Sequence, residues 1–408
     1  MPFSKIFNDP VYGFITVNDR LIQQLIDHPY FQRLARISQL GMSGMVYPGA
    51  KHTRFHHALG AMHLMKQTID TLRAKGTNIS DHECRSALIA ILLHDIGHGP
   101  FSHTLEHSIL EGYDHESLSL QMMEKLNEEF NGALQTAIDI FTGNYFRNFF
   151  HQLVSGQLDV DRLDYLMRDS FYTGVAEGVI GSERIIKMMY VVDDVLCIEE
   201  KGIYSIEKFL IARRLMYWQV YLHKTVIAAE MLMLLIMQRA RHLAAGGIQL
   251  FATSAFSRFL YPMPLNDAAY LEDFTLIDDM DVLASVKEWS RHPDPVLSSL
   301  CLRLINRRLF KAVWMHEAPP DSHLDYLTNQ VAALYGLSIK EATYFVKWDK
   351  VIQLPYDATK GEIWIFTKNG ERRNIFEASD NLSRDHLSHP VEKFILCYPK
   401  ELNIKDEK

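Results

Sequence analysis

Cysteine is scarce in this chain, which has four cysteines among its 408 residues. None of them lies close to another in the sequence: they are Cys84, Cys197, Cys301 and Cys397. Disulfide-stapled domains and cysteine-based zinc sites both depend on closely spaced cysteines. The spacing therefore favours neither of these two classes.

Long apolar runs are lacking as well. No uninterrupted run approaches the length that crosses a membrane, and the first residues do not combine a basic stretch with an apolar one. We therefore expect a cytoplasmic protein with no membrane partner. The net charge of −8 disfavours broad electrostatic binding to nucleic acid, although a local basic pocket is compatible with that total.

The overall composition is that of an ordinary globular protein, with 48% hydrophobic and 23% charged residues. The first two-thirds of the chain shows the apolar spacing of helices. A helix is expected to begin near Arg54 with Thr53 as its cap. Residues 84–93 are almost all apolar and predict a buried central helix, which Gly97 and the Gly99-Pro100 pair should end.

We predict a mostly α fold, a helical core with a smaller C-terminal α+β unit. Residues 1–245 form the core, with a short hairpin near 195–206 that turns at Lys201-Gly202, followed by one long helix from Ile206 to His242. Residues 246–305 form a helical extension, and residues 306–408 form the α+β unit. In that unit the pattern predicts a helix at 325–335, a turn at 368–370 and strands at 310–314, 344–348, 363–367 and 394–398.

Three patches concentrate residues that bind metals. The segment from Leu93 to His103 holds three histidines and an aspartate directly after an apolar run. A second patch runs from Arg54 to Gly60, and a third from Asp159 to Tyr165. Imidazole nitrogens and carboxylate oxygens together bind divalent cations, and an apolar core rarely tolerates such groups unpaired.

One histidine, then an adjacent His-Asp pair, then a distant aspartate is the order typical of the HD superfamily of metal-dependent phosphohydrolases. The chain resembles this superfamily, in particular its deoxynucleoside triphosphate triphosphohydrolase branch, from about residue 7 to residue 224. The resemblance rests on residues 31–34, 39–41, 47–50, 54–60, 94–103, 115–116, 159–169 and 221–224. It implies hydrolysis of deoxynucleoside triphosphates to nucleoside and inorganic triphosphate, and assembly into dimers or tetramers.

The resemblance assigns the metal ligands to His57, His94, Asp95 and Asp161. Two imidazoles and two carboxylates nearly neutralise a divalent ion and leave room for water or a phosphate oxygen. Iron, manganese, zinc and magnesium all remain open, magnesium being the least natural with two nitrogen ligands. Asp164 follows Asp161 by one helical turn and is expected to orient a ligand histidine, whereas Asp159 is expected to cap the helix.

The resemblance also assigns the other site residues. The histidines of the chemistry are His98, His103 and His115, with Glu106 in the place where relatives have an aspartate that links His103 to His115. The cations that bind phosphate are Arg54, Arg162 and Lys224. The nucleoside contacts are Gln39, Leu40, Tyr165, Asp169 and Tyr221, of which Tyr165 would pack beneath the sugar and Asp169 would bind its 3′-hydroxyl. His52 and His56 have no such counterpart and are expected to face solvent.

Other interpretations stay open. Another HD reaction, such as a nucleotide phosphatase or a single-strand nuclease, would use the same ligands. A nucleotide-binding sensor with little turnover would keep the same pocket. Finally, each histidine or aspartate taken alone is more often a satisfied core residue than a ligand; the ordered set of four favours a metal site.

Overall fold

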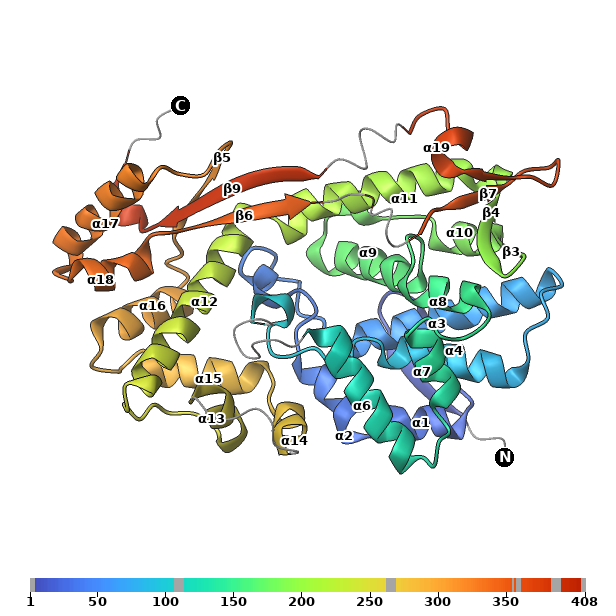
Figure 1. Ribbon diagram of the computed structural model, residues 1–408, viewed down its shortest axis with the longest axis horizontal. Helices are drawn as coiled ribbons and strands as arrows, with labels where there is room; N and C mark the ends of the chain where they lie inside the picture. Colours follow the sequence, from blue (N-terminus) through green and yellow to red (C-terminus); the bar gives the residue numbers. More distant parts are fainter. Residues whose placement is uncertain are drawn as a thin grey trace.

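The computed structural model describes residues 4–105, 114–261, 269–353, 356, 361–382 and 390–404. Helices make up most of the described chain, and the strands form three small sheets. The predicted mostly α fold is therefore confirmed (Figure 1).

Three helices form the centre of the core: α3 (Arg54–Ala74), α4 (Asp81–Leu93) and α9 (Val160–Thr173). α3 packs against both α4 and α9. The surrounding elements are β1 (Lys5–Asp9), β2 (Gly13–Val17), α1 (Arg20–Asp27), α2 (Pro29–Gln32), α6 (His115–Glu129), α7 (Gln135–Phe141), α8 (Asn148–Ser155) and α10 (Ser182–Met188).

The ends of the central helices follow local signals in the sequence. Thr53 caps α3, and the side chain of His56 returns a contact to the backbone of Thr53, as predicted for a helix beginning at Arg54. α4 is buried as expected and has its C-cap at His94. The chain is therefore free to leave helical geometry where His94 and Asp95 begin.

The predicted hairpin lies at a different place. β3 (Met189–Val192) pairs with β4 (Val195–Glu199) through Asp193 and Asp194, both of which have positive φ. Two such residues make the tight turn that matches strand twist, and aspartate tolerates this conformation. The expected turn at Lys201-Gly202 is wrong: residues 200–202 form a 3₁₀ turn that leads into a helix.

The predicted long helix is also interrupted. α11 (Ile203–Met216) runs into a π-helical turn at Tyr217–Tyr221, and α12 (Lys224–Ala245) begins after His223, whose side chain accepts a hydrogen bond from the backbone N–H of Thr225. The two helical pieces bend by 54° at this break. None of the helices in the described ranges could cross a membrane alone; only this bent pair, taken together, has the length and composition for it.

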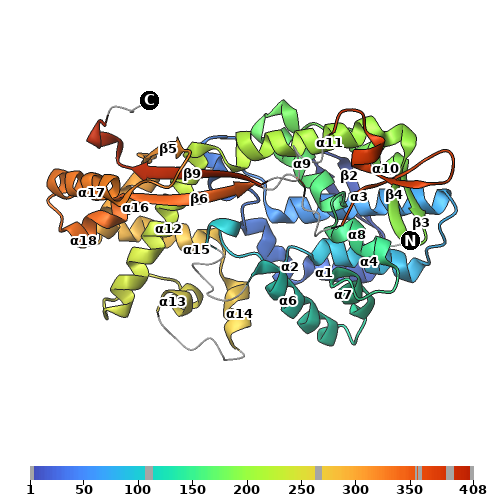
Figure 2. The ribbon, with the colours of Figure 1, turned by 45° about the horizontal axis from the view of Figure 1, so that its top comes forward.

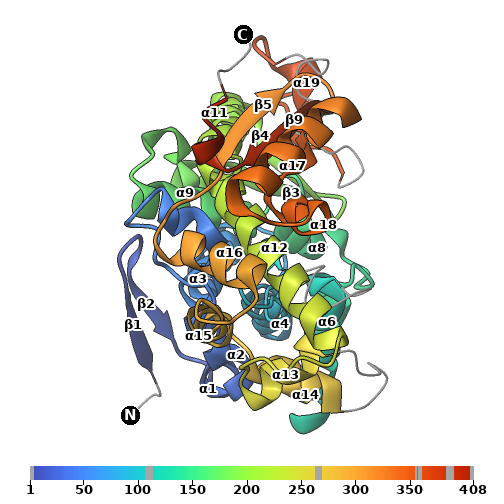
Figure 3. The same cartoon turned by 90° about the vertical axis from the view of Figure 1, so that its left-hand side faces the viewer.

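The helical extension packs along α12. It consists of α13 (Ser254–Leu260), α14 (Ala269–Leu276), α15 (Asp279–Trp289) and α16 (Pro295–Ile305). α16 packs against α12 and α15 (Figure 3). The extension thus lies beside the core rather than apart from it.

The C-terminal residues contribute to two sheets instead of one separate unit. β5 (Lys311–Met315), β9 (Val391–Tyr398) and β6 (Lys347–Gln353) form an antiparallel sheet in the order β5-β9-β6 beside α17 (Asp321–Tyr335) and α18 (Ile339–Ala342). β7 (Trp364–Phe366), β8 (Arg372–Asn374) and α19 (Ile375–Ala378) lie at the other end of the molecule (Figure 2).

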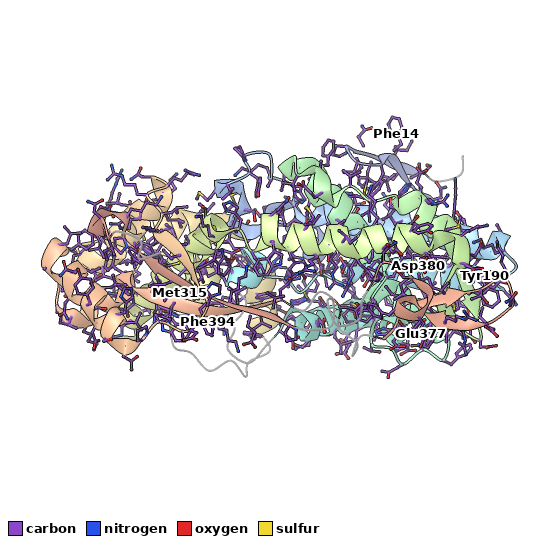
Figure 4. The ribbon with its side chains drawn as sticks, turned by 90° about the horizontal axis from the view of Figure 1, so that it is seen from above. Phe14, Tyr190, Met315, Glu377, Asp380 and Phe394 are labelled. Carbon is purple, nitrogen blue, oxygen red and sulfur yellow. The ribbon has the colours of Figure 1, made fainter. Side chains whose placement is uncertain are left out.

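The second sheet joins the core because β7 pairs in parallel with the open edge of β4, giving the order β3-β4-β7-β8. In Figure 4, Met315 and Phe394 mark the first sheet, and Tyr190 and Glu377 mark the region of the second. The strands expected at 310–314, 363–367 and 394–398 are confirmed, as is the turn at 368–370. The strand expected at 344–348 begins only at Lys347, because residues 343–345 form a 3₁₀ turn.

Candidate metal centre and active site

The four proposed ligands meet where α3, α4 and α9 come together. Nε2 of His57 lies 3.1 Å from Oδ1 of Asp161, and Nε2 of His94 lies 3.6 Å from the same oxygen. Asp95 places its two oxygens 3.3 Å from Nε2 of His94 and 3.7 Å from Nε2 of His57. The donor atoms of His57, His94 and Asp161 all lie within 4.8 Å of one another, which is close enough to share one ion.

The orientation of the two imidazoles fits a metal site. Nδ1 of His57 contacts Oδ2 of Asp164 at 2.7 Å, and Nδ1 of His94 contacts the carbonyl of Ile91 at 2.6 Å. In each contact the ring Nδ1–H donates to an oxygen, so the unprotonated Nε2 can present its lone pair to a cation. Both Nε2 atoms are buried and have no hydrogen-bond partner among the described residues. Leaving such atoms unsatisfied is costly, and a cation at their meeting point would satisfy both.

The electrostatics of the cluster favour positive charge. Burial acts to lower the pKa of His57, but the nearby carboxylates of Asp161 and Asp164 outweigh burial and raise the pKa to about 10. Burial acts to raise the pKa of Asp161, but the two histidines hold it well below its usual range. The carboxylates therefore attract either protons on the imidazoles or a divalent cation in their place.

A buried ion-pair network fixes the position of Asp164, the residue that contacts His57. Arg168 binds both oxygens of Asp164 at 2.9 and 3.0 Å and an oxygen of Asp9 at 2.7 Å. Gly60 on α3 lies against this network, because a Cβ there would stand 2.0 Å from Oδ1 of Asp164 and 2.1 Å from Nη2 of Arg168. The network thus leaves no room for any side chain at Gly60.

A cavity of about 410 Å³ opens beside Asp95 and Asp161. Eight other residues proposed from the sequence line it: Gln39, Leu40, Arg54, His98, His115, Tyr165, Asp169 and Tyr221. Eight further lining residues were not among the predicted site residues: Gly41, Ser43, Phe101, Ser102, Thr104, Tyr217, Leu222 and Glu230. The cavity therefore joins the ligand cluster to most of the proposed substrate contacts.

Arg54 and the stacked pair of His98 and His115 stand next to the ligands. Arg54 forms an ion pair with Asp95 and donates from Nε to the hydroxyl of Ser102 at 2.8 Å. The rings of His98 and His115 stack with centroids 4.0 Å apart, and Nε2 of His98 lies 3.4 Å from Oδ1 of Asp95. Burial, helped by Arg54, holds the pKa of His98 well below its ordinary value, so this ring is neutral near pH 7.

Two proposed phosphate contacts do not reach the cavity. Lys224 is exposed at the first residue of α12 and does not line it. Arg162 is buried but also stands outside the lining, since its guanidinium binds Asp159 at 2.8 Å. Asp159 caps α9 by accepting from the backbone N–H of Arg162, as expected. The side chain of His103 and the whole of Glu106 lie outside the described residues.

The expectation that His52 faces solvent is wrong. This ring is buried, stacks on Tyr172 with centroids 4.4 Å apart, and contacts Oδ1 of Asp169 through Nε2 at 2.8 Å. Tyr221 donates to Oδ2 of the same carboxylate at 2.7 Å. No local pattern could have shown this contact, because the two partners are 117 residues apart.

The helical extension also supports the site. Asp279 at the start of α15 accepts from the backbone N–H of Phe101 at 2.8 Å and from that of Ser38 at 2.9 Å. Phe101 and Ser102 both have positive φ, a conformation that non-glycine residues rarely adopt. Asp279 thereby ties the strained loop after His98 to the loop before Gln39.

Comparison with known proteins identifies this arrangement. The HD domain family matches residues 54–168, and the HD associated region matches residues 180–249. YwfO of Bacillus subtilis (strain 168), a protein without a characterised function, is 33% identical over 416 residues that cover 98% of this chain and 93% of YwfO. The chain belongs to the HD-domain family of phosphohydrolases.

Two further relatives bear on the fold and the activity of this HD-domain protein. The crystal structure of a phosphohydrolase from Bacteroides thetaiotaomicron VPI-5482 superposes with a TM-score of 0.94 at 51% identity, covering 97% of this chain and 100% of that one. The deoxynucleoside triphosphate triphosphohydrolase SAMHD1 homolog of Dictyostelium discoideum is 34% identical over 240 residues, 54% of this chain and 46% of that protein.

Proposed function

We propose that this HD-domain protein hydrolyses deoxynucleoside triphosphates to the deoxynucleoside and inorganic triphosphate, with a divalent cation held by His57, His94, Asp95 and Asp161. One observation carries the proposal: a single cavity contains oxygens of the ligand cluster together with Gln39, Tyr165 and Asp169, the residues that the resemblance assigns to the sugar. The likeness to the Dictyostelium triphosphohydrolase over the core supports the same substrate class.

The residues around the cluster suit attack on a phosphate. When bound, the cation would supply Lewis acidity that activates water and polarises the phosphoryl group. Arg54 lines the cavity next to Asp95 and can neutralise phosphate charge. Water forms a new bond to the α-phosphorus, the bond from that phosphorus to the 5′ oxygen breaks, and the leaving oxygen takes a proton. His103 stays the predicted proton donor, with His115 to orient it.

The sugar end of the cavity is fixed by hydrogen bonds. His52 and Tyr221 hold both oxygens of Asp169, so this carboxylate has one orientation toward a ligand. It keeps free lone pairs that can accept from a 3′-hydroxyl. Tyr165 lies one helical turn before Asp169 in α9 and also lines the cavity. Its ring would pack against the sugar and leave no room for a 2′-hydroxyl.

Product analysis tests this proposal directly. Purified protein incubated with manganese and the four deoxynucleoside triphosphates is expected to release inorganic triphosphate. Release of pyrophosphate or single phosphate would show that the cleaved bond is another one, and hydrolysis of nucleoside monophosphates or single-stranded DNA alone would favour another HD reaction. Elemental analysis of the same sample decides among iron, manganese, zinc and magnesium, and light scattering tests the predicted dimer or tetramer.

A variant separates an enzyme from a nucleotide sensor. Asp161→Ala removes the oxygen that both ligand histidines approach and is expected to abolish metal binding and turnover. Asp70→Ala removes an exposed carboxylate from α3 and should change neither. A wild-type protein that binds metal and nucleotide yet turns over no faster than Asp161→Ala would be a sensor.

A further inference from the structure

One carboxyl group of the cavity has no part in the reaction proposed above. Glu230 lies in the second turn of α12 and lines the cavity together with Leu222 and Thr104. Thr104 donates to Oε1 of Glu230 at 3.2 Å. Within the part of the chain that the structure describes, Glu230 forms no ion pair, and its Oε2 receives no hydrogen bond. A carboxylate can accept about four hydrogen bonds, so most of this capacity is left for a ligand.

The space beside this carboxyl is kept open by Gly41. A Cβ at Gly41 would stand 3.7 Å from Oε1 of Glu230, 3.3 Å from Oγ1 of Thr104 and 3.2 Å from the carbonyl oxygen of Phe101. Gly41 also has a φ of +47°, which a side chain would disfavour. Three oxygen atoms therefore border a small space, and a ligand group that enters it must bring hydrogen-bond donors.

The surroundings make such donors valuable. Burial raises the pKa of Glu230 to about 7, and the hydrogen bond from Thr104 only partly opposes it. The ionised carboxylate is thus poorly solvated, and each N–H that a ligand donates to it replaces a missing water contact. Hydrogen bonds to a charged acceptor are also the stronger kind.

The other carboxylates that line the cavity are already engaged. Asp95 and Asp161 belong to the ligand cluster. Asp169 is held by His52 and Tyr221 at the sugar end. Leu222 directly follows Tyr221 and precedes α12, so Glu230 stands on the helix that begins just after the proposed sugar contact Tyr221. The base of a bound nucleotide would then meet the one carboxylate among the described lining residues that is not yet engaged in these ways, that of Glu230.

We propose that Glu230 reads the base of the nucleotide and selects guanine, an inference that rests on the proposed function because it takes this cavity as the nucleotide site. Guanine is the DNA base that presents two adjacent N–H donors, N1–H and the N2 amino group, which match the two oxygens of a carboxylate. Adenine and cytosine place a ring-nitrogen acceptor beside their amino group, and thymine flanks its one N–H with carbonyls. Each of these would set an acceptor against the carboxylate.

Binding of deoxynucleoside monophosphates to the metal-loaded protein tests the inference without requiring turnover. The wild type is expected to bind dGMP about tenfold more tightly than dAMP, dCMP or dTMP, the discrimination of one good bidentate contact. Glu230→Gln replaces one acceptor by a donor, so the preference for dGMP should disappear and dAMP should gain. Glu207→Gln makes the same change in a buried residue of α11 that contacts Ser379 and Asn381, and should keep the preference.

The outcomes also separate this inference from the proposed function. Equal binding of all four bases by the wild type, or a guanine preference that survives in Glu230→Gln, would overturn the role of Glu230. The same is true if Glu207→Gln loses the preference equally. Triphosphate release from all four nucleotides at equal rates would keep the proposed function and reject the inference. Selective dGMP binding without triphosphate release would keep the inference and reject the function.

Discussion

Nδ1 of His57 lies 2.7 Å from Oδ2 of Asp164, and this contact decides which nitrogen of the ring faces the ligand cluster. Asp164 itself is fully buried and is held by Arg168. The proposed ligand histidine is therefore oriented by a residue outside the proposed ligand set. Loss of such a partner typically lowers metal affinity or activity by about 10- to 100-fold.

Asp164→Asn is expected to lower metal affinity about 10- to 100-fold, because the amide no longer fixes the proton on Nδ1 of His57. Calorimetric titration with manganese measures the effect. Asp9→Asn is the matched control, since Asp9 is the other carboxylate bound to Arg168 and does not contact His57. Equal losses in the two variants would show that the network acts through the fold alone.

Gly60→Ala is expected to lower the free energy of unfolding by about 3–5 kcal/mol, because its Cβ would displace both partners of the buried ion pair between Asp164 and Arg168. Denaturant unfolding of the two proteins checks this value. Gly181→Ala is the control: it places a Cβ no nearer than 3.8 Å to Arg184, at an exposed residue with negative φ, and should change stability by less than about 1 kcal/mol. A Gly60→Ala protein as stable as Gly181→Ala would contradict the packing described here.

Asp279→Asn is expected to lower kcat/KM about tenfold, because one of the two backbone N–H groups of Ser38 and Phe101 would then face an amide donor. Asp281→Asn alters a carboxylate on the same helix that accepts from Thr253 and from the backbone of Asp278, away from both loops. It should cost similar stability and leave kcat/KM nearly unchanged. If both variants lost activity to the same extent, the link between the two loops would have no role in positioning.

The pH dependence of stability should report on Glu230. The folded pKa of about 7 exceeds the ordinary value of 4.5, so the folded protein binds this proton more tightly than the unfolded chain. Ionisation therefore favours unfolding, and this penalty grows as the pH rises from 4.5 through 7. The free energy of unfolding of the wild type, measured without nucleotide, should fall relative to that of Glu230→Gln by about 1–2 kcal/mol between about pH 5 and about pH 8. Parallel profiles for the two proteins would contradict the raised pKa of this carboxyl.

Local signals in the sequence were enough for several features of the site. The cap at Thr53 and the apolar run before His94 predicted where α3 begins and α4 ends. Helical spacing placed Asp164 one turn from Asp161, and the resemblance, which assigns only Asp161 as a ligand, suggested that Asp164 contacts a ligand histidine. The order of the ligand residues then indicated the family.

Other features depended on partners distant in the sequence. Local pattern favoured a turn at Lys201-Gly202, whereas the pairing of β3 with β4 set the hairpin at Asp193-Asp194. The parallel pairing of β7 with β4 joins residues more than 160 positions apart, as Cys197 and Trp364 show. A strand edge accepts any segment that reaches it, so the local sequence did not specify this partner.

By itself, the sequence determined most of the helices and caps such as Thr53, because these depend on residue type and on spacing within a few turns, and the order of its histidines and aspartates indicated the family. The tertiary structure alone decided that His52 orients Asp169, that Asp279 joins two loops of the site, and that Glu230 enters the cavity while Lys224 stays outside it. These contacts cross from one element to another. The packing of elements against one another fixes these contacts. The spacing of residues within one element therefore cannot predict them.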